Sequence, residues 1–262
     1  MKETRVVILA AGKGTRMQSE LPKVLHKVEG KTMIQHSIDK VRELGVGDII
    51  LVVGYKKEMV QETVGDSVKY AVQEEQLGTG HAVMQARPFL EGFEGNVVVL
   101  YGDMPLINPA TIKKLIDARE SDNAKGALLT IVLDNPPDFG RIVRDEAGRV
   151  LRIVEKKDCS PEEEAIKEVN VGMYCFDSQE LLAALDGLST DNAQGEYYLT
   201  DVAGIMADKG LTVKTVTSDT LEETLGINDP HHLEFAESLG DIQYAESLYE
   251  LIDATLAMKR KN

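Results

Sequence analysis

The sequence contains no tryptophan, few aromatic residues and only two cysteines, Cys159 and Cys175. Two cysteines cannot build a disulfide framework, although the count alone leaves a single bridge open. Cys175 lies in the apolar run Val171–Phe176, which favours a buried thiol. We therefore expect a reduced protein of the cytoplasm.

Long apolar runs are also missing from the sequence. No stretch reaches the roughly 18 consecutive apolar residues that a membrane span requires. The run Val6–Ala11 is shorter than the core of a signal peptide, and it passes directly into Gly-Lys-Gly. The sequence therefore predicts no membrane partner and no secretory leader.

Basic side chains are scarce relative to acidic ones. The chain has 29 Lys and Arg against 44 Asp and Glu, a net charge of −15 at pH 7. An average surface of this charge repels polyanions, which argues against a nucleic-acid partner. Any phosphate ligand must then be held by a local group of positive charges.

Short apolar runs alternate with segments of helical spacing. The runs with strand character are Val6–Ala10, Asp48–Val53, Val97–Tyr101, Ala127–Leu133, Val169–Phe176 and Leu211–Val216. The helical segments include Met33–Leu44, Thr79–Phe89 and Pro109–Ala118. Strands that alternate with helices predict an α/β fold of Rossmann-like type, with a mostly parallel central sheet and helices on both faces.

Two segments depart from this alternation. Residues Phe139–Val154 predict a small β-hairpin appendage with its turn near Asp145–Gly148. From Pro230 onward, apolar residues recur at helical spacing as far as Leu256. We expect residues 1–229 to form the body, and residues 230–262 a helical tail that packs on the body or joins a second copy into a homo-oligomer.

Ligands of parallel α/β sheets bind beyond the carboxyl ends of the strands, where the following loops gather. The candidate loops are Ala11–Met17, Gly54–Glu58, Gly102–Leu106 and the segments around Gly140 and Asn170. The first of these contains Gly12-Lys-Gly-Thr-Arg-Met17 directly after a strand. Its glycines let backbone N–H groups approach a phosphate. Met17 excludes both a Walker loop and a dinucleotide fingerprint, because each needs a different residue there.

The motifs as a set resemble those of the sugar-1-phosphate nucleotidyltransferases, and more closely the bacterial N-acetylglucosamine-1-phosphate uridyltransferases of GlmU type. The resemblance begins with Leu9-Ala-Ala-Gly-Lys-Gly-Thr-Arg-Met17 and Leu21-Pro-Lys23. It continues in order through Gln73–Ala82, Tyr101–Asp103, Gly140-Arg141, Ile153–Glu155, Glu168–Gly172, Asn192–Asp201 and Gly226–Asn228. A chance match of all these blocks in one order is very improbable.

The resemblance implies a Mg²⁺-dependent reaction in which UTP and N-acetylglucosamine 1-phosphate give UDP-N-acetylglucosamine and pyrophosphate. It implies that Arg16 binds the departing phosphates and Lys23 the α-phosphate region. The implied nucleotide-binding residues are Leu9, Ala10, Ala11, Gly12, Gly14, Gln73, Gly78, Thr79, Tyr101 and Gly102. The implied sugar-binding residues are Gly140, Glu155, Asn170 and Thr200, and the implied metal ligands are Asp103 and Asn228.

Each of these residues also has a purely structural interpretation. Asp103 could cap the turn after a strand, Asn170 could satisfy backbone groups, and Glu155 could be an exposed charge among lysines. Asn228 next to Asp229-Pro230 could form a turn. The order and spacing of the blocks favour the functional interpretation. Two alternatives stay open, a nucleotidyltransferase for another sugar 1-phosphate and a catalytically silent nucleotide-sugar binding or assembly subunit.

The sequence departs from the family pattern in two places. Pro230 stands where the family usually has an arginine, which leaves the geometry just beyond Asn228 open. The bifunctional members continue into a left-handed β-helix of hexapeptide repeats, and no such repeat occurs before Asn262. We therefore expect neither the acetyltransferase activity of that domain nor the trimer that it builds. The five histidines show no metal-binding spacing.

Overall fold

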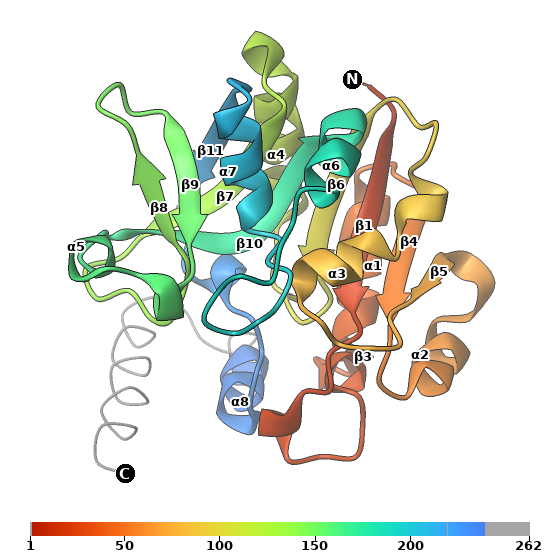
Figure 1. The fold of residues 1–262 in the computed structure, drawn as a ribbon. Helices are drawn as coiled ribbons and strands as arrows, with labels where there is room; N and C mark the ends of the chain where they lie inside the picture. The colour runs from red at the N-terminus through yellow and green to blue at the C-terminus, as the bar shows by residue number, and fades with distance from the viewer. Residues whose placement is uncertain (1, 219, 239–262) are drawn as a thin grey trace.

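The computed structural model describes residues 2–218 and 220–238. A nine-stranded sheet lies at its centre (Figure 1). Along its main path the strand order is β11-β7-β10-β6-β1-β4-β5. Those strands are β1 (Thr4–Ala10), β4 (Ile49–Val53), β5 (Lys69–Val72), β6 (Asn96–Tyr101), β7 (Gly126–Val132), β10 (Glu168–Asp177) and β11 (Val213–Thr217). The predicted α/β class and mostly parallel sheet are confirmed.

One strand of this path runs against the others. The pairs β1–β4, β1–β6, β4–β5 and β7–β11 are parallel, whereas β10 pairs antiparallel with both β6 and β7. The amino end of β10 therefore lies at the same edge as the carboxyl ends of its neighbours. This reversal brings Asn170, near the start of β10, to the ligand-binding edge of the sheet.

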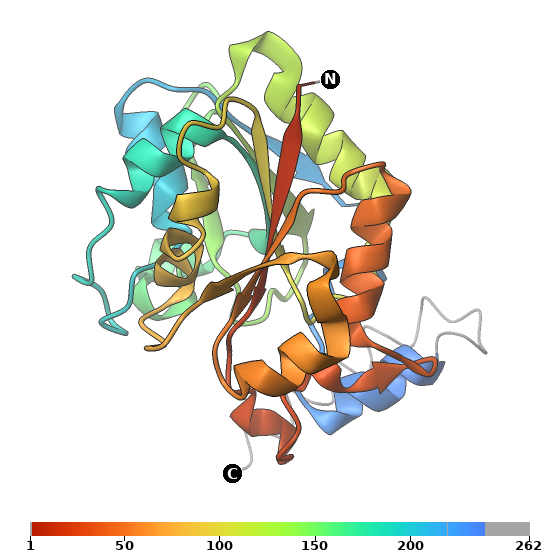
Figure 2. The same ribbon diagram turned by 90° about the vertical axis from the view of Figure 1, so that its right-hand side faces the viewer.

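Helices cover both faces of the sheet (Figure 2). One apolar cluster joins the sheet to α1 (Met33–Glu43), α2 (Lys57–Val64) and α4 (Pro109–Glu120). The other joins it to α3 (Thr79–Met84), α6 (Ser178–Leu185) and α7 (Asp201–Asp208). Side chains of a strand alternate between its two faces, so Val6 and Ile8 belong to the first cluster and Val7 to the second.

The hairpin appendage is confirmed, with β8 (Arg141–Arg144) antiparallel to β9 (Val150–Val154). Its turn closes with the Gly148 N–H donating to the Asp145 carbonyl at 2.9 Å. The expected helix over Thr79–Phe89 is wrong beyond Met84, where α3 ends. Arg87–Phe89 forms a separate 3-10 turn instead, because Pro88 cannot donate the backbone hydrogen bond that would continue α3.

The chain after the sheet packs back on the body. Helix α8 (Pro230–Ser238) places Leu233 and Ala236 in a small cluster with Val28 and Ile227. Val28 belongs to a two-stranded hairpin of β2 (Lys27–Val28) and β3 (Lys31–Thr32). The rest of the predicted tail, and with it any contact to a second copy, lies outside the described residues.

A four-residue helix, α5 (Pro161–Glu164), follows β9.

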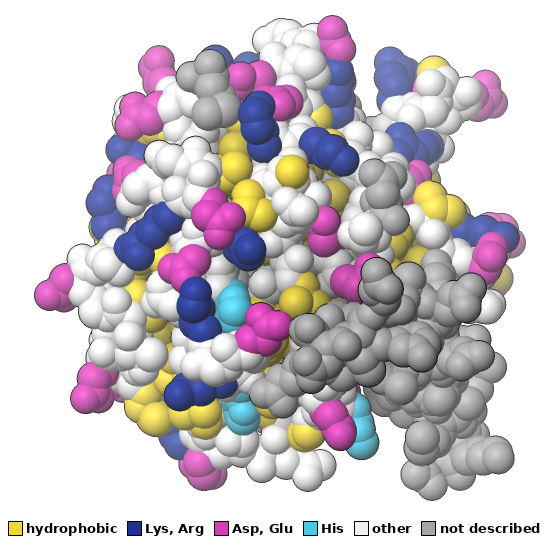
Figure 3. Space-filling model, turned by 180° about the vertical axis from the view of Figure 1, so that it is seen from behind, with side chains coloured by type: hydrophobic (Ala, Val, Ile, Leu, Met, Phe, Trp, Pro, Cys, Tyr) yellow, Lys and Arg dark blue, Asp and Glu magenta, His cyan; other side chains and the backbone are white. Residues whose placement is uncertain are grey.

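Consistent with the composition of the sequence, the surface of the described residues carries both acidic and basic side chains. Acidic and basic side chains are interspersed on the face shown in Figure 3, and its described residues form no continuous basic patch there. Across residues 2–218 and 220–238, none of the helices has the length and apolar character needed to cross a membrane. Both cysteines are free thiols, and burial raises the pKa of Cys175 well above its ordinary value.

Candidate functional site

The loop after β1 lies close to the side chain of Lys23. Gly14 has a φ of 61°, and a Cβ built there would lie 2.6 Å from the Cβ of Lys23. A side chain at position 14 would therefore be strained by the positive φ and would have to displace Lys23. Met17, whose side chain excludes the two common phosphate-loop patterns, is 4% exposed and anchors the loop in the core.

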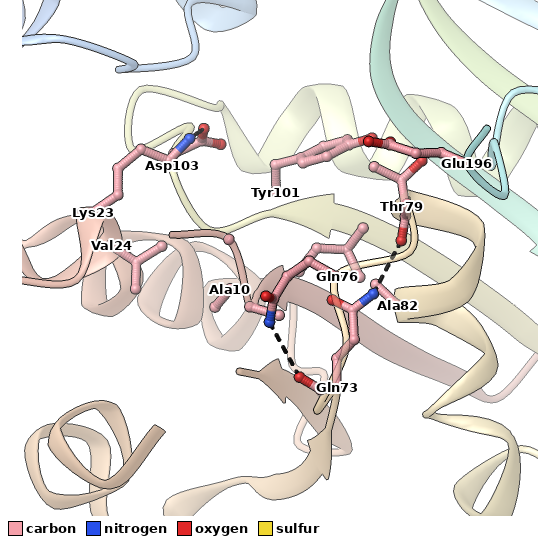
Figure 4. Close-up of a pocket in the computed structure, with 14 residues that line it drawn as sticks. Ala10, Lys23, Val24, Gln73, Gln76, Thr79, Ala82, Tyr101, Asp103 and Glu196 are labelled. Carbon is pink, nitrogen blue, oxygen red and sulfur yellow. Dashed lines mark hydrogen bonds and ion pairs between the residues drawn. The ribbon is translucent and has the colours of Figure 1, made fainter. Parts of the chain in front are cut away.

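Two cations and two oxygen ligands meet beyond the carboxyl ends of β1 and β6. The Lys23 ammonium forms an ion pair with the Asp103 carboxylate and donates to Asn228 Oδ1 at 3.1 Å. Arg16 Nη2 donates to the same Asn228 oxygen at 2.9 Å. The four residues come from three separate segments, so the fold assembles the predicted phosphate and metal residues in one cluster. Figure 4 shows the side chains of Lys23 and Asp103 meeting end to end.

The orientation of Asn228 suits a cation ligand. Its Nδ2 donates to the Gly226 carbonyl at 2.9 Å, which leaves Oδ1 facing the cluster. The Ile227 N–H donates to the Asp103 carbonyl at 2.9 Å and ties the two segments together. Because the Lys23 ammonium reaches both side-chain oxygens, one cation can contact Asp103 and Asn228 together. Within residues 2–218 and 220–238, no group of three or more His, Cys, Asp and Glu side chains could hold a metal.

A first cavity of about 260 Å³ lies between the glycine loop and the start of α3 (Figure 4). Most of the predicted nucleotide residues line it. The lining consists of Leu9, Ala10, Ala11, Gly12, Lys23, Val24, Gln73, Gln76, Gly78, Thr79, Ala82, Tyr101, Asp103 and Glu196. Gly78 has a φ of 113°, and a Cβ there would lie 2.5 Å from the Tyr197 carbonyl.

The carboxamide of Gln73 is held in one orientation. Gln73 is 3% exposed. Its Nε2 donates to the Gly78 carbonyl at 3.1 Å and lies 3.1 Å from His81 Nδ1. A carbonyl can only accept, so the amide nitrogen must face Gly78 and the amide oxygen remains an acceptor. Such an acceptor matches the N–H of a uracil imide.

A second cavity of about 470 Å³ adjoins the first and shares Lys23, Tyr101 and Asp103 with it. Of the four predicted sugar residues, Gly140, Glu155 and Asn170 line this cavity. Thr200 does not line it. It is 4% exposed and donates to Glu155 Oε1 at 3.0 Å, so it supports the Glu155 carboxylate from behind.

Burial and neighbouring charges set the properties of the second cavity. Burial raises the pKa of Glu155, against the hydrogen bond from Thr200, which lowers it. Asn170 donates through Nδ2 to the Tyr174 hydroxyl at 2.8 Å and accepts from the Gly172 N–H at 3.3 Å. Glu155 is thus not an ordinary exposed charge, and its carboxylate is held as an acceptor at the cavity wall.

Gly14, Gly102 and the loop Gly54–Glu58 line neither cavity. Gly102 acts through its backbone, because its N–H donates to the Leu9 carbonyl at 2.9 Å. Sequence reasoning missed some lining residues, of which Gln76, Glu196, Phe139, Thr224 and His232 are examples. Gln76 and Glu196 lie inside motifs quoted above, so only their individual roles went unassigned. The other three carry no pattern that indicates a ligand.

Comparisons with known proteins agree with this geometry. The sequence profile described as nucleotidyl transferase matches residues 5–237. A protein named bifunctional protein GlmU from Brevibacillus brevis is 50% identical over 238 residues, which are 91% of this chain and 52% of the relative. Its namesake from Clostridium novyi is 50% identical over 234 residues, 89% of this chain and 51% of the relative. The chain thus spans about half the length of the curated relatives that it matches.

The fold also matches a solved structure. A crystal structure from Bacillus anthracis, whose name assigns it as a glucose-1-phosphate thymidylyltransferase in complex with sucrose, aligns with a TM-score of 0.70. The alignment covers 92% of this chain and 97% of that one at 22% sequence identity. At that identity the match establishes the fold alone.

Proposed function

This chain belongs to the nucleotidyl transferase family, and we propose that it transfers UMP from UTP to N-acetylglucosamine 1-phosphate and releases pyrophosphate. The observation that carries the proposal is the pair of adjoining cavities that share Lys23, Tyr101 and Asp103. A transfer between two substrates needs such a shared boundary, because the reacting atoms must meet there. We propose residues 1–229 as the nucleotidyltransferase domain.

The first cavity is the proposed nucleotide site. Gln73 offers its amide oxygen to the uracil N–H, and the backbone of the loop Ala11–Gly14 offers N–H groups to the phosphates. Arg16 is exposed in the loop after β1 and lines the second cavity next to the shared boundary, and in the proposal it stabilises the departing pyrophosphate. Lys23, at the boundary of both cavities, stabilises the charge that develops at the α-phosphate.

The second cavity is the proposed site of the sugar phosphate. Glu155 and Asn170 hold hydrogen-bonding groups at its wall, and such groups suit the hydroxyls and acetamido group of N-acetylglucosamine. The phosphate of this substrate is already an anion at neutral pH, so no side chain has to deprotonate it. The residues must instead bring two anions together in line, which positive charge and positioning achieve.

Asp103 and Asn228 are the proposed ligands of Mg²⁺. The ion would supply positive charge that draws the phosphates together and stabilises the transferred group. The donor set suits it, because Mg²⁺ binds oxygen ligands and keeps several sites for water and phosphate oxygens. Both side-chain oxygens contact the Lys23 ammonium, which supports the proposal that they share one cation.

The deciding experiment is a pyrophosphate-release assay that crosses UTP, dTTP and CTP with several sugar 1-phosphates, with and without Mg²⁺. We expect the highest kcat/KM for UTP with N-acetylglucosamine 1-phosphate, and a loss of activity when EDTA removes the metal. A preference for glucose or glucosamine 1-phosphate would assign another sugar. UTP binding without pyrophosphate release from any pair would identify a silent binding subunit instead.

A further inference from the structure

Arg141 is a fully buried cation in β8, directly after Gly140. Its side chain is among the largest that the core encloses, with a residue exposure of 2%. Its guanidinium donates to backbone carbonyls. Nη1 reaches Phe139 at 2.5 Å and Pro137 at 3.0 Å. Longer contacts of 3.5 Å run from Nη2 to the Pro136 carbonyl and from Nε to the Glu164 carbonyl.

The two carbonyls with the shorter contacts, those of Phe139 and Pro137, belong to one wall of the second cavity. Pro137, Asp138, Phe139 and Gly140 all line it, whereas Arg141 itself does not. Residues 133–140 form neither helix nor strand, so no regular backbone ladder holds this wall. Pro136 and Pro137 have no backbone N–H, which further reduces the hydrogen bonds that the segment can make with its neighbours. The Arg141 guanidinium supplies N–H donors to the carbonyls of this segment.

The backbone of Arg141 is fixed independently of its side chain. It pairs with Val154 of β9 and with Val169 of β10. In addition, the Asn170 N–H donates to the Gly140 carbonyl at 2.8 Å. Backbone pairing therefore holds the strand in place, and the guanidinium extends from it to the 136–139 segment. A change of the side chain should disturb the wall more than the strand.

We propose that Arg141 is a positioning residue for the sugar phosphate, which holds the 136–139 wall of the second cavity in its binding shape. The inference rests on the proposed assignment of that cavity to the sugar phosphate. A planar guanidinium carries five donors in a fixed fork, and an ammonium on a flexible stem does not reproduce that fork. Arg141→Lys therefore keeps the charge and removes the geometry.

The chain offers a matched control on the same strand. Arg144 also donates through its guanidinium, to the two Glu168 carboxylate oxygens at 2.7 and 2.8 Å and to the Gly148 carbonyl at 2.8 Å. It does not line either cavity and its contacts do not involve the 136–139 segment. Arg144→Lys thus makes the same chemical change three residues away without touching the wall.

The test measures kcat and both KM values for Arg141→Lys, Arg141→Met and Arg144→Lys, with melting temperature as a check on folding. For Arg141→Lys we expect the KM for N-acetylglucosamine 1-phosphate to rise about tenfold or more. The KM for UTP stays within about twofold, and Arg144→Lys leaves both KM values unchanged. Equal rises in both KM values, or no change in a folded Arg141→Lys protein, would overturn the inference. The same criteria apply to Arg141→Met if it folds.

Amide hydrogen exchange provides a readout that needs no turnover. In Arg141→Lys, residues 138–140 should exchange faster while β10 keeps its protection, because only the wall loses its donors. Unchanged exchange of residues 138–140 overturns the inference. A wild-type protein that turns over no sugar phosphate would contradict the proposed function instead, and the exchange result would still decide whether Arg141 holds the wall.

Discussion

The side-chain oxygen of Asn228 accepts a hydrogen bond from the Lys23 ammonium at 3.1 Å, although 205 residues separate the two in the sequence. Arg16 donates to that oxygen as well. The proposed phosphate-binding cations and metal-ligand oxygens therefore form one cluster. Within this cluster the Asp103 carboxylate neutralises one of the two cations, and the Lys23 ammonium contacts the oxygens proposed as metal ligands, which leads to the first two predictions.

Replacing Asp103 by Asn should lower the rate of pyrophosphate release by about 100-fold or more, since an amide oxygen offers the cation no net charge. Steady-state assays at saturating UTP and Mg²⁺ measure the change. The control is Asp117→Asn, because Asp117 pairs with Lys113 at 2.6 Å on the exposed face of α4, away from both cavities. A folded Asp103→Asn protein with a near-normal rate would rule out the proposed metal role.

Lys23→Ala should have two opposite effects. Pyrophosphate release should fall sharply, because the phosphates lose a positive partner at the boundary of the cavities. In the absence of nucleotide, however, Mn²⁺ should bind more tightly than to the wild type, because the ammonium no longer competes for the Asp103 and Asn228 oxygens. Mn²⁺ titration followed by electron paramagnetic resonance measures the second effect.

The control for Lys23→Ala is Lys31→Ala, which removes an exposed partner of Asp39 at 2.6 Å. It should leave both the rate and the Mn²⁺ affinity unchanged. Equal Mn²⁺ affinity in wild type and Lys23→Ala would mean that the ammonium does not occupy the cation position in solution.

Glu155→Gln should stabilise the protein at neutral pH while it weakens turnover. Burial raises the pKa of Glu155 above the ordinary 4.5, so the folded state holds the proton more tightly than the unfolded state. The wild type therefore loses stability as the pH rises through that raised pKa. The amide does not titrate, so the melting temperature of Glu155→Gln should increasingly exceed that of the wild type as the pH rises above 4.5.

Glu163→Gln is a control for which the melting temperature at neutral pH should change in the opposite direction. The Ser160 N–H and the Arg152 side chain lower the pKa of Glu163, so its carboxylate stabilises the fold above the ordinary pKa, and this contribution is lost as the pH falls. Glu163→Gln should therefore lower the melting temperature at pH 7 and have little effect in acid. If both variants shift the melting temperature in the same direction, burial does not set the behaviour of Glu155.

Gly172→Ala should distort the second cavity in addition to straining the backbone. Gly172 has a φ of 95°, and a Cβ there would lie 2.8 Å from the Tyr101 ring, which borders both cavities. The control is Gly210→Ala. Gly210 has a φ of 72°, and no atom lies within 4 Å of the added carbon. Both variants should lose about 1 kcal/mol or more of stability from backbone strain.

The two glycine variants differ in their expected kinetics. Gly172→Ala should also raise the KM values for both substrates, because it displaces the shared Tyr101. Gly210→Ala should leave the KM values as they are. Thermal unfolding and steady-state kinetics on both proteins separate strain from displacement, and unchanged KM values in Gly172→Ala would show that Tyr101 tolerates the added methyl group.

Much of the site could be predicted because its chemistry is concentrated in motifs that follow strands. The glycine loop, Lys23 and Asp103 all lie where a parallel sheet gathers its loops, and their residue types fit phosphate and cation binding. Asn228 was also predictable, although only its place in an ordered series of motifs distinguished it from a turn residue.

Other features were not accessible, for physical reasons. A buried strand has the same apolar pattern in either direction, so the sequence did not show that β10 is reversed. Helix α2 and strand β5 went unpredicted because each is too short, with eight and four residues, to show a clear apolar spacing. Pro137, Asp138 and Phe139 line the second cavity without forming a sequence motif that indicates a ligand.

The reversed strand β10 contributes to the second cavity alone, through Asn170, Val171 and Gly172. The first cavity takes most of its lining from the segments around β1, β5 and α3, whereas the second combines the segments around β8, β9 and β10 with Arg16 and residues between 224 and 232. A redesign of the hairpin and its neighbouring wall could therefore change which sugar is accepted while the glycine loop keeps its nucleotide. Tyr101, at the end of β6, lines both cavities, so any change to it alters both of them together.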